Sequence, residues 1–230
     1  MKKKLLAFFI CLVMTAGLLP TVAFAAENYD LYVDGEQFTS ENLSIACGEG
    51  TATYDPDTTT LTLHNATIDN DITANYGIRA SIPDTLKIRL TGANTITRTD
   101  IGGGSGIRSD NAVEIIGDGT LTINVKGDTY DGVYVGADLK ISDKATVEIN
   151  SKGGLGISAD GIVEIDDAIV NSTGRHAGID AYGLKITNGA DVTLMATKDN
   201  CNGAFIRKDN EGNGGNIELI ASKVKATSFY

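Results

Sequence analysis

The sequence predicts an all-β protein, a three-stranded parallel β-helix of about six turns behind an N-terminal β-hairpin cap. The main observation is a short phrase, a glycine followed by a β-branched residue and two polar or small residues, which returns every 22 to 29 residues. A period of that length is typical of a solenoid, in which no unit buries its apolar face alone. The phrase begins at Gly77, Gly106, Gly132, Gly156 and Gly178, with a degenerate copy at Gly203.

Each repeat contains two further short strands with alternating apolar and polar residues. The alternation has period two, so it places the apolar residues on one face of a strand and the polar residues on the other. We therefore expect Ile107, Val133, Ile157 and Ile179, which follow the repeated glycines, to stack in a core. No stretch has helical periodicity, so we expect almost no helix.

The central residues of the second strands carry charges of alternating sign. Opposite charges facing each other on neighbouring strands stabilise a sheet by a few tenths to about 1 kcal/mol. This face is therefore predicted to be structural. The column reads Lys87, Glu114, Lys140, Glu164, Lys185, Glu218.

The third strands instead present polar residues such as Thr122, Glu148, Asn171 and Thr193. Such a ladder stabilises stacked strands, and it also offers a hydrogen-bonding strip to a glycan.

The N-terminal block differs from the repeats. Residues 29–33 alternate and lead through Asp34-Gly35 into residues 36–38, and a second hairpin joins residues 51–54 to 61–63 through Asp55-Pro56-Asp57. Asp-Gly and Pro at these positions favour tight turns. We predict a β cap over residues 26–68, which covers the first edge of the solenoid, and β-helix repeats over residues 69–230.

The first 25 residues have the features of a secretory signal peptide: three lysines, an apolar run, and Ala23-Phe24-Ala25 as a cleavage site. A membrane anchor is the alternative. Cleavage removes three lysines and no acid, which moves the formal charge from −11 to −14. We expect a secreted or cell-surface protein that is not inserted in the membrane after cleavage.

The acidic balance also bears on partners. Nucleic acids and anionic membranes require a basic face, so neither is an expected partner, whereas extracellular acidic residues are natural ligands for Ca²⁺. We expect a monomer. Cys47 and Cys201 lie near opposite ends of the predicted solenoid, too far apart for a disulfide, and we predict free thiols.

The first-strand face is the best candidate for a binding site. It carries Arg79, Arg108, Tyr134 and Asp180, and the adjoining corners carry Tyr130 and Tyr182. Arginine grips a carboxylate with its planar fork, and an aromatic ring packs against the face of a sugar. The simpler alternative is that these residues only cover a solvated sheet.

Catalytic patterns are weak. Asp166 and Asp167 are adjacent, so on one strand they point to opposite faces, whereas glycoside cleavage needs two carboxyls on one substrate. His64 and His176 are the only histidines, and neither has the sequence neighbours of a catalytic triad or a metal site. We expect no enzymatic activity.

The glycine phrases and three-strand repeats over residues 77–228 resemble the right-handed parallel β-helix superfamily that includes pectate lyases and polygalacturonases. The resemblance implies a right-handed solenoid. Catalytic members carry clustered acids with a basic helper, and only Asp166-Asp167 and His176 echo such motifs here. The catalytic roles are therefore not carried over.

The N-terminal block, with Leu31-Tyr32-Val33-Asp34-Gly35 and Thr60-Leu61-Thr62-Leu63, is similar to one found on secreted proteins of Gram-positive anaerobes. Some β-helical proteins of this kind are described as carbohydrate-binding domains. This resemblance implies a secreted or surface glycan-binding or adhesin-like module and identifies no ligand. Together with the arginines and tyrosines of the first-strand face, it makes a non-catalytic module for a polysaccharide or cell-surface glycan, with acidic polysaccharide first, the leading expectation. The alternatives are an adhesin-like structural solenoid with a protein partner and, third, a polysaccharide lyase or hydrolase.

Overall fold

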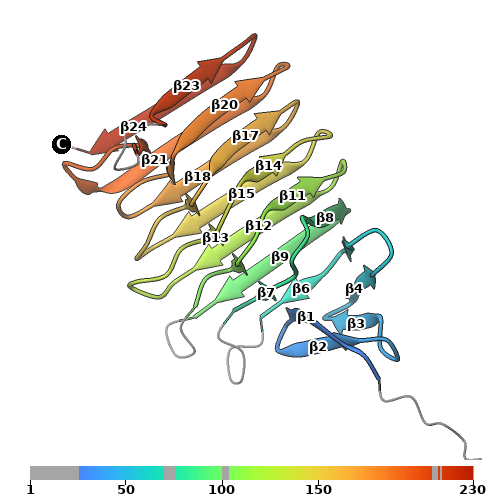
Figure 1. Ribbon diagram of the computed structural model, residues 1–230. Helices are drawn as coiled ribbons and strands as arrows, with labels where there is room; N and C mark the ends of the chain where they lie inside the picture. The colour runs from blue at the N-terminus through green and yellow to red at the C-terminus, as the bar shows by residue number, and fades with distance from the viewer. Residues whose placement is uncertain (1–25, 70–75, 100–103, 209–211, 213, 230) are drawn as a thin grey trace, which may run out of the picture.

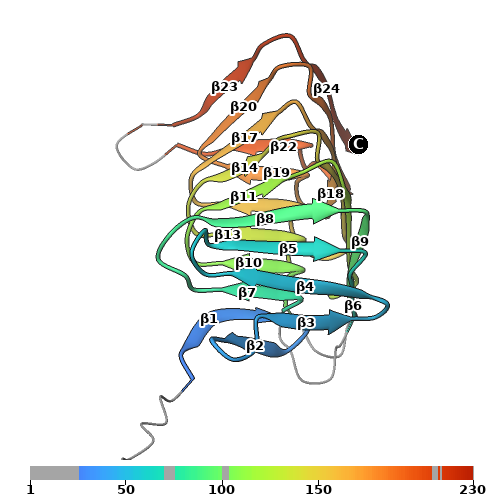
Figure 2. The same cartoon turned by 90° about the vertical axis from the view of Figure 1, so that its right-hand side faces the viewer.

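The computed structural model describes residues 26–69, 76–99, 104–208, 212 and 214–229. The described residues are built from strands and turns and contain no helix, so they also contain no helix able to cross a membrane. The predicted signal peptide lies outside the described residues. The strands form three sheets, named A, B and C, that wind around one core (Figures 1 and 2).

Sheet A is formed by the glycine phrases together with the first N-terminal hairpin. Its strands are β1 (Asn28–Val33), β2 (Glu36–Thr39), β7 (Ile78–Ala80), β10 (Ile107–Ser109), β13 (Val133–Val135), β16 (Ile157–Ala159), β19 (Ile179–Ala181) and β22 (Ala204–Ile206).

Sheet B contains the alternating-charge strands and the second hairpin. Its strands are β3 (Ser44–Cys47), β4 (Gly50–Asp55), β5 (Thr60–His64), β8 (Leu86–Thr91), β11 (Val113–Ile116), β14 (Leu139–Ile141), β17 (Ile162–Asp166), β20 (Gly183–Thr187) and β23 (Asn216–Leu219).

Sheet C contains the third strand of each repeat. Its strands are β6 (Thr67–Ile68), β9 (Ala93–Arg98), β12 (Thr120–Val125), β15 (Thr146–Ser151), β18 (Ile169–Gly174), β21 (Asp191–Asp199) and β24 (Lys223–Phe229).

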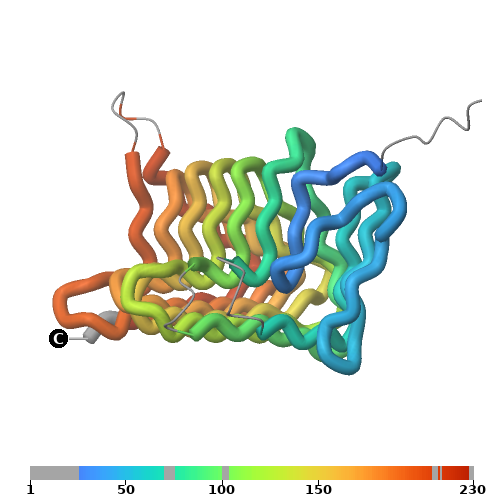
Figure 3. The backbone as a smooth tube through the Cα atoms, turned by 90° about the horizontal axis from the view of Figure 1, so that it is seen from below, coloured from blue at the N-terminus to red at the C-terminus, as the bar shows by residue number. Residues whose placement is uncertain are grey.

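From β7 onward every strand pairs in parallel with its counterpart one repeat away, which confirms the parallel β-helix. Among the described residues, six rungs from β7–β9 to β22–β24 are separated by five repeat intervals, so the solenoid makes about five turns rather than six. Seen from below, successive turns follow the same path side by side (Figure 3).

The two predicted N-terminal hairpins are present. β1 pairs antiparallel with β2 through Asp34 and Gly35, both of which have positive φ, and β4 pairs antiparallel with β5. β1 also pairs antiparallel with β7, and β5 pairs in parallel with β8. The N-terminal strands therefore extend sheets A and B of the solenoid directly.

The predicted core column is confirmed. Ile107, Val133, Ile157 and Ile179 occupy matching positions on neighbouring strands of sheet A, and each is fully buried. The glycine before each of them is needed for close packing. A Cβ atom added to Gly132 would lie 2.1 Å from Cγ2 of Ile149 and 2.6 Å from the carbonyl oxygen of Gly156.

The charge column of sheet B has the predicted register, with opposite charges paired at every step from Lys87 to Glu218. Glu164 forms ion pairs of 3.6 Å with both Lys140 and Lys185. Cys47 and Cys201 are both free, as predicted, and Cys47 is buried in β3. Burial raises the pKa of the Cys47 thiol to about 11, and nearby Asp34 adds to the rise.

Candidate functional site

The outward side chains of sheet A form one continuous column along the solenoid. Strand pairing brings the predicted residues Arg79, Arg108, Tyr134 and Asp180 into this column, in that order, with Ser158 between the last two. Tyr32 of β1 faces Arg79 and extends the column toward the N-terminus. Period-two alternation and parallel register therefore bring together four of the six predicted site residues.

Arg108 is held between two aromatic rings. Its guanidinium carbon lies 4.6 Å from the centroid of the Tyr134 ring and 5.7 Å from that of Tyr76. Its nearest acid is Asp110, at 3.8 Å from Nε, and the Asp110 carboxylate also accepts a hydrogen bond of 2.6 Å from Ser81. The guanidinium is thus oriented by its ring contacts, and its side chain remains 38% exposed.

Tyr134 and Arg79 are fixed less tightly. The Tyr134 hydroxyl donates a hydrogen bond of 2.8 Å to Asp160, which raises the pKa of the phenol. Arg79 is exposed, with its guanidinium 6.0 Å from the centroid of the Tyr32 ring. The N-terminal half of the column thus presents two arginines flanked by tyrosines.

In the C-terminal half of the column, the polar side chains are engaged by Arg207. Its guanidinium pairs with Asp180 and Asp160, donates a hydrogen bond of 2.6 Å to the carbonyl oxygen of Ala159, and lies 4.5 Å from the centroid of the Tyr182 ring. Burial raises the pKa of Asp180, and the Arg207 charge partly offsets the rise. The Asp180 carboxylate is therefore engaged within the protein.

Asp131 adds a partly buried acid at the entry to β13. Its carboxylate accepts a hydrogen bond of 2.7 Å from the amide of Leu155. Burial raises the pKa of Asp131, and the nearby Asp180 contributes in the same direction. This carboxylate therefore holds the neighbouring corner at Leu155.

The two corner tyrosines lie at opposite edges of sheet A. Tyr130 precedes β13, on the side of sheet C, and its carbonyl oxygen accepts a hydrogen bond from Ser151. Tyr182 follows β19, on the side of sheet B, and packs on Arg207. They do not extend the Arg108 cluster.

The adjacent residues Asp166 and Asp167 have structural roles in a turn. Asp166 accepts hydrogen bonds from Thr187 and Asn188, which lower its pKa, and Asp167 has a positive φ of 47°. His176 lies 4.0 Å from the Cys201 sulfur in an exposed corner. In the described parts of the chain, no group of three or more histidine, cysteine or acidic side chains is placed to hold a metal ion.

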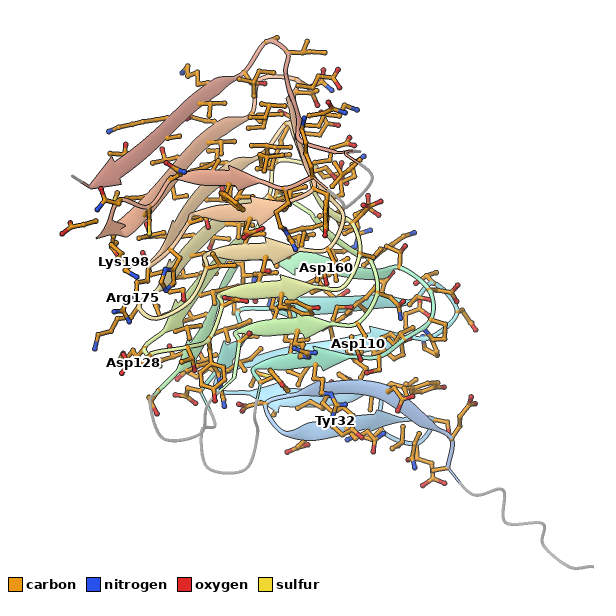
Figure 4. All side chains as sticks on the ribbon, turned by 60° about the vertical axis from the view of Figure 1, so that its left-hand side comes forward. Tyr32, Asp110, Asp128, Asp160, Arg175 and Lys198 are labelled. Atoms are coloured by element: carbon orange, nitrogen blue, oxygen red, sulfur yellow. The ribbon has the colours of Figure 1, made fainter. Side chains whose placement is uncertain are left out.

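At the corner between sheets A and B lies a second row of polar side chains, of which sequence reasoning found Tyr182 and missed Asp110, Asp160 and Arg207. Asp110, Asp160, Tyr182 and Arg207 each directly follow the four-residue glycine phrase, and their amides bond to corners one rung below. Reading the repeat one residue further would have revealed this row. Figure 4 shows Tyr32, Asp110 and Asp160 at increasing height on one side of the molecule, and Asp128, Arg175 and Lys198 along another edge.

A scan against protein-family models gives no match, and searches of curated proteins and of solved structures give none.

Proposed function

We propose that this protein is a secreted or cell-surface, non-catalytic carbohydrate-binding module, and that acidic polysaccharide binds to the N-terminal half of the sheet A column. The observation that carries the proposal is the position of Arg108, whose guanidinium lies between the rings of Tyr76 and Tyr134, with its nearest acid, Asp110, 3.8 Å from Nε. An arginine held in this way loses little side-chain conformational entropy when it binds a carboxylate.

Arg79 and Arg108 are paired across neighbouring strands, which are about 4.8 Å apart. Two cations at this spacing can contact successive acidic sugars of one chain. Tyr134 supplies an adjacent apolar ring for a pyranose face. The net negative charge of the protein opposes an anionic ligand, so moderate salt, which screens distant charges more than contacts, favours the specific complex.

The test is the affinity of the mature protein for galacturonate oligomers, measured by isothermal titration calorimetry. A charge-assisted hydrogen bond contributes about 1.5–3 kcal/mol, so Arg108→Ala is expected to weaken binding at least about tenfold. Lys140→Ala is the matched control, because it removes one positive charge from the paired column of sheet B.

Equal losses in the two variants would point to net charge or stability as the cause and would contradict the proposal. So would unchanged affinity in Arg108→Ala. Thermal unfolding of each variant separates a binding effect from a folding effect.

The second candidate function is an adhesin-like structural solenoid with a protein partner. It is favoured by the exposed apolar side chains of the last rung, Ile217, Leu219 and Val224, which stack on core positions of the rung below. Exposed apolar patches mark protein contacts. A glycan array that gives no acidic ligand, together with capture of a cell-surface protein, would favour this function over the first.

A further inference from the structure

We infer that a second binding surface, separate from sheet A, runs along the edge of sheet C and takes a linear acidic glycan without a metal ion. Its main feature is a row of four exposed cations in four successive rungs. The cation row consists of Lys126, Lys152, Arg175 and Lys198. This inference is independent of the sheet A proposal, because the two surfaces share no residue.

Backbone hydrogen bonds place Lys152 next to Lys126, because the amide of Lys152 donates to the carbonyl oxygen of Val125, directly before Lys126. Arg175 and Lys198 lie in the next two rungs, displaced along the chain: the amide of Arg175 donates to the carbonyl oxygen of Gly154, and the amide of Lys198 donates to that of Arg175. Lys152, Arg175 and Lys198 line one hollow of about 480 Å³. Figure 4 shows Arg175 and Lys198 next to each other at this edge.

The charges of the cation row are only partly compensated within the protein. In the described part of the chain, none of the four cations forms an ion pair, although Asp128 and Asp199 line the same hollow. Like charges on neighbouring strands destabilise a sheet. Sheet B of the same protein avoids this cost by alternating the sign at every rung. The hollow is lined by three cations and two acids, and an excess of cations at one place in an acidic protein points to an external anion.

The surface beside the cation row matches sugar hydroxyls. A groove of about 400 Å³ adjoins the first hollow and shares Lys152 and Thr197 with it. Its wall is a ladder of outward polar side chains on adjacent strands, in which Asn150 donates a hydrogen bond of 3.3 Å to Asn124. The ladder consists of Thr97, Asn124, Asn150 and Thr173.

This combination defines the ligand class. Amide and hydroxyl groups hydrogen-bond to hydroxyls at each rung, while one cation per rung faces one acidic group per repeat. The strand spacing of about 4.8 Å is comparable to the length of one sugar unit, so an extended chain with one carboxylate or sulfate per sugar fits. Because the cations supply the charge directly, calcium is not needed.

The experiment measures binding of fluorescein-labelled oligogalacturonate and of a labelled heparin oligosaccharide to the full mature chain by anisotropy, with EDTA present. Polyphosphate of similar length is the charge-only probe. The double variant Lys152→Ala/Arg175→Ala is compared with Lys140→Ala/Lys185→Ala, which removes the same charge from sheet B. The conservative variant Lys152→Arg/Arg175→Lys keeps both charges.

The inference predicts that at least one of the two glycans binds in EDTA, and the tighter one identifies carboxylate or sulfate as the preferred group. In the Arg108→Ala background, which removes the contribution of the sheet A site, Lys152→Ala/Arg175→Ala should weaken that binding at least tenfold and flatten its salt dependence. In the same background the sheet B double variant should change it less than twofold, and the conservative variant should retain it.

The inference is overturned if neither glycan binds, if the two alanine double variants lose affinity equally, or if polyphosphate binds as tightly as the glycans; the variant Arg108→Ala provides a further test. Arg108→Ala separates the two surfaces. If only Arg108→Ala loses affinity for the glycan, the sheet C surface is contradicted and the sheet A site is supported. If only the cation-row variant loses affinity, the sheet A site is contradicted and the sheet C surface is supported.

Discussion

The substitution Ile157→Asp tests the core register most directly. Ile157 is fully buried and lies between Val133 and Ile179 in the core column of sheet A. Truncating a buried isoleucine costs about 2–5 kcal/mol, and a buried polar group without a partner adds about 1–3 kcal/mol. The sum is comparable to the whole stability of an ordinary domain, about 5–15 kcal/mol.

The same chain offers a matched control five residues away. Ile162 is 50% exposed on β17, so Ile162→Asp should cost less than about 1 kcal/mol, the span of strand propensities. Urea denaturation followed by circular dichroism at 25 °C measures both variants. Because each rung packs only on its neighbours, Ile157→Asp should unfold the rungs around β16 first.

The stability of the Ile157→Asp variant should depend on pH in one direction. An aspartate at position 157 has its folded-state pKa raised by burial above the unfolded value of about 3.9. Its ionisation penalty is therefore absent below about pH 3.9 and grows as the pH rises toward the raised folded-state pKa, by about 1.4 kcal/mol per unit. Similar losses for Ile157→Asp and Ile162→Asp, or no pH dependence in the first, would refute the inward assignment.

Three further predictions concern single groups. Asp131 has a raised folded-state pKa, so its ionisation costs stability as the pH rises above about 3.9. Urea midpoints should show Asp131→Asn at least as stable as wild type at pH 7, with the difference vanishing near pH 3. A clear loss of stability at pH 7 would contradict this. Gly132→Ala should lower the free energy of unfolding by about 1–3 kcal/mol or more, because the added Cβ meets backbone. Gly183→Ala should cost less, because the nearest atom to its added Cβ is an Ile162 side-chain carbon at 3.2 Å. Equal thermal shifts in the two variants would argue against close packing at Gly132. In the native protein, a thiol reagent at pH 8 should label Cys201 rapidly and buried Cys47 only on unfolding, since the thiolate is the reactive form. Rapid labelling of both would show that β3 opens readily.

The repeat architecture could be predicted from the sequence because its cause is local and periodic. Gly132 recurs where a side chain would collide with the next rung, and alternation of period two assigns Ile157 inward and Tyr134 outward. A slip of one residue would bury the Lys140–Glu164 charges, so the register also followed from the sequence.

The pairing of outward groups depended on the tertiary structure. Arg207 bonds to Asp160 across 47 residues and also forms an ion pair with Asp180. The Asp180 carboxylate is therefore engaged within the protein, and Arg108 is the more available guanidinium. The sequence period does not specify this, because each pairing depends on the path of an irregular corner and on the height at which it meets another rung. The cation row was missed for the same reason: its residues become neighbours only when the corners after sheet C stack.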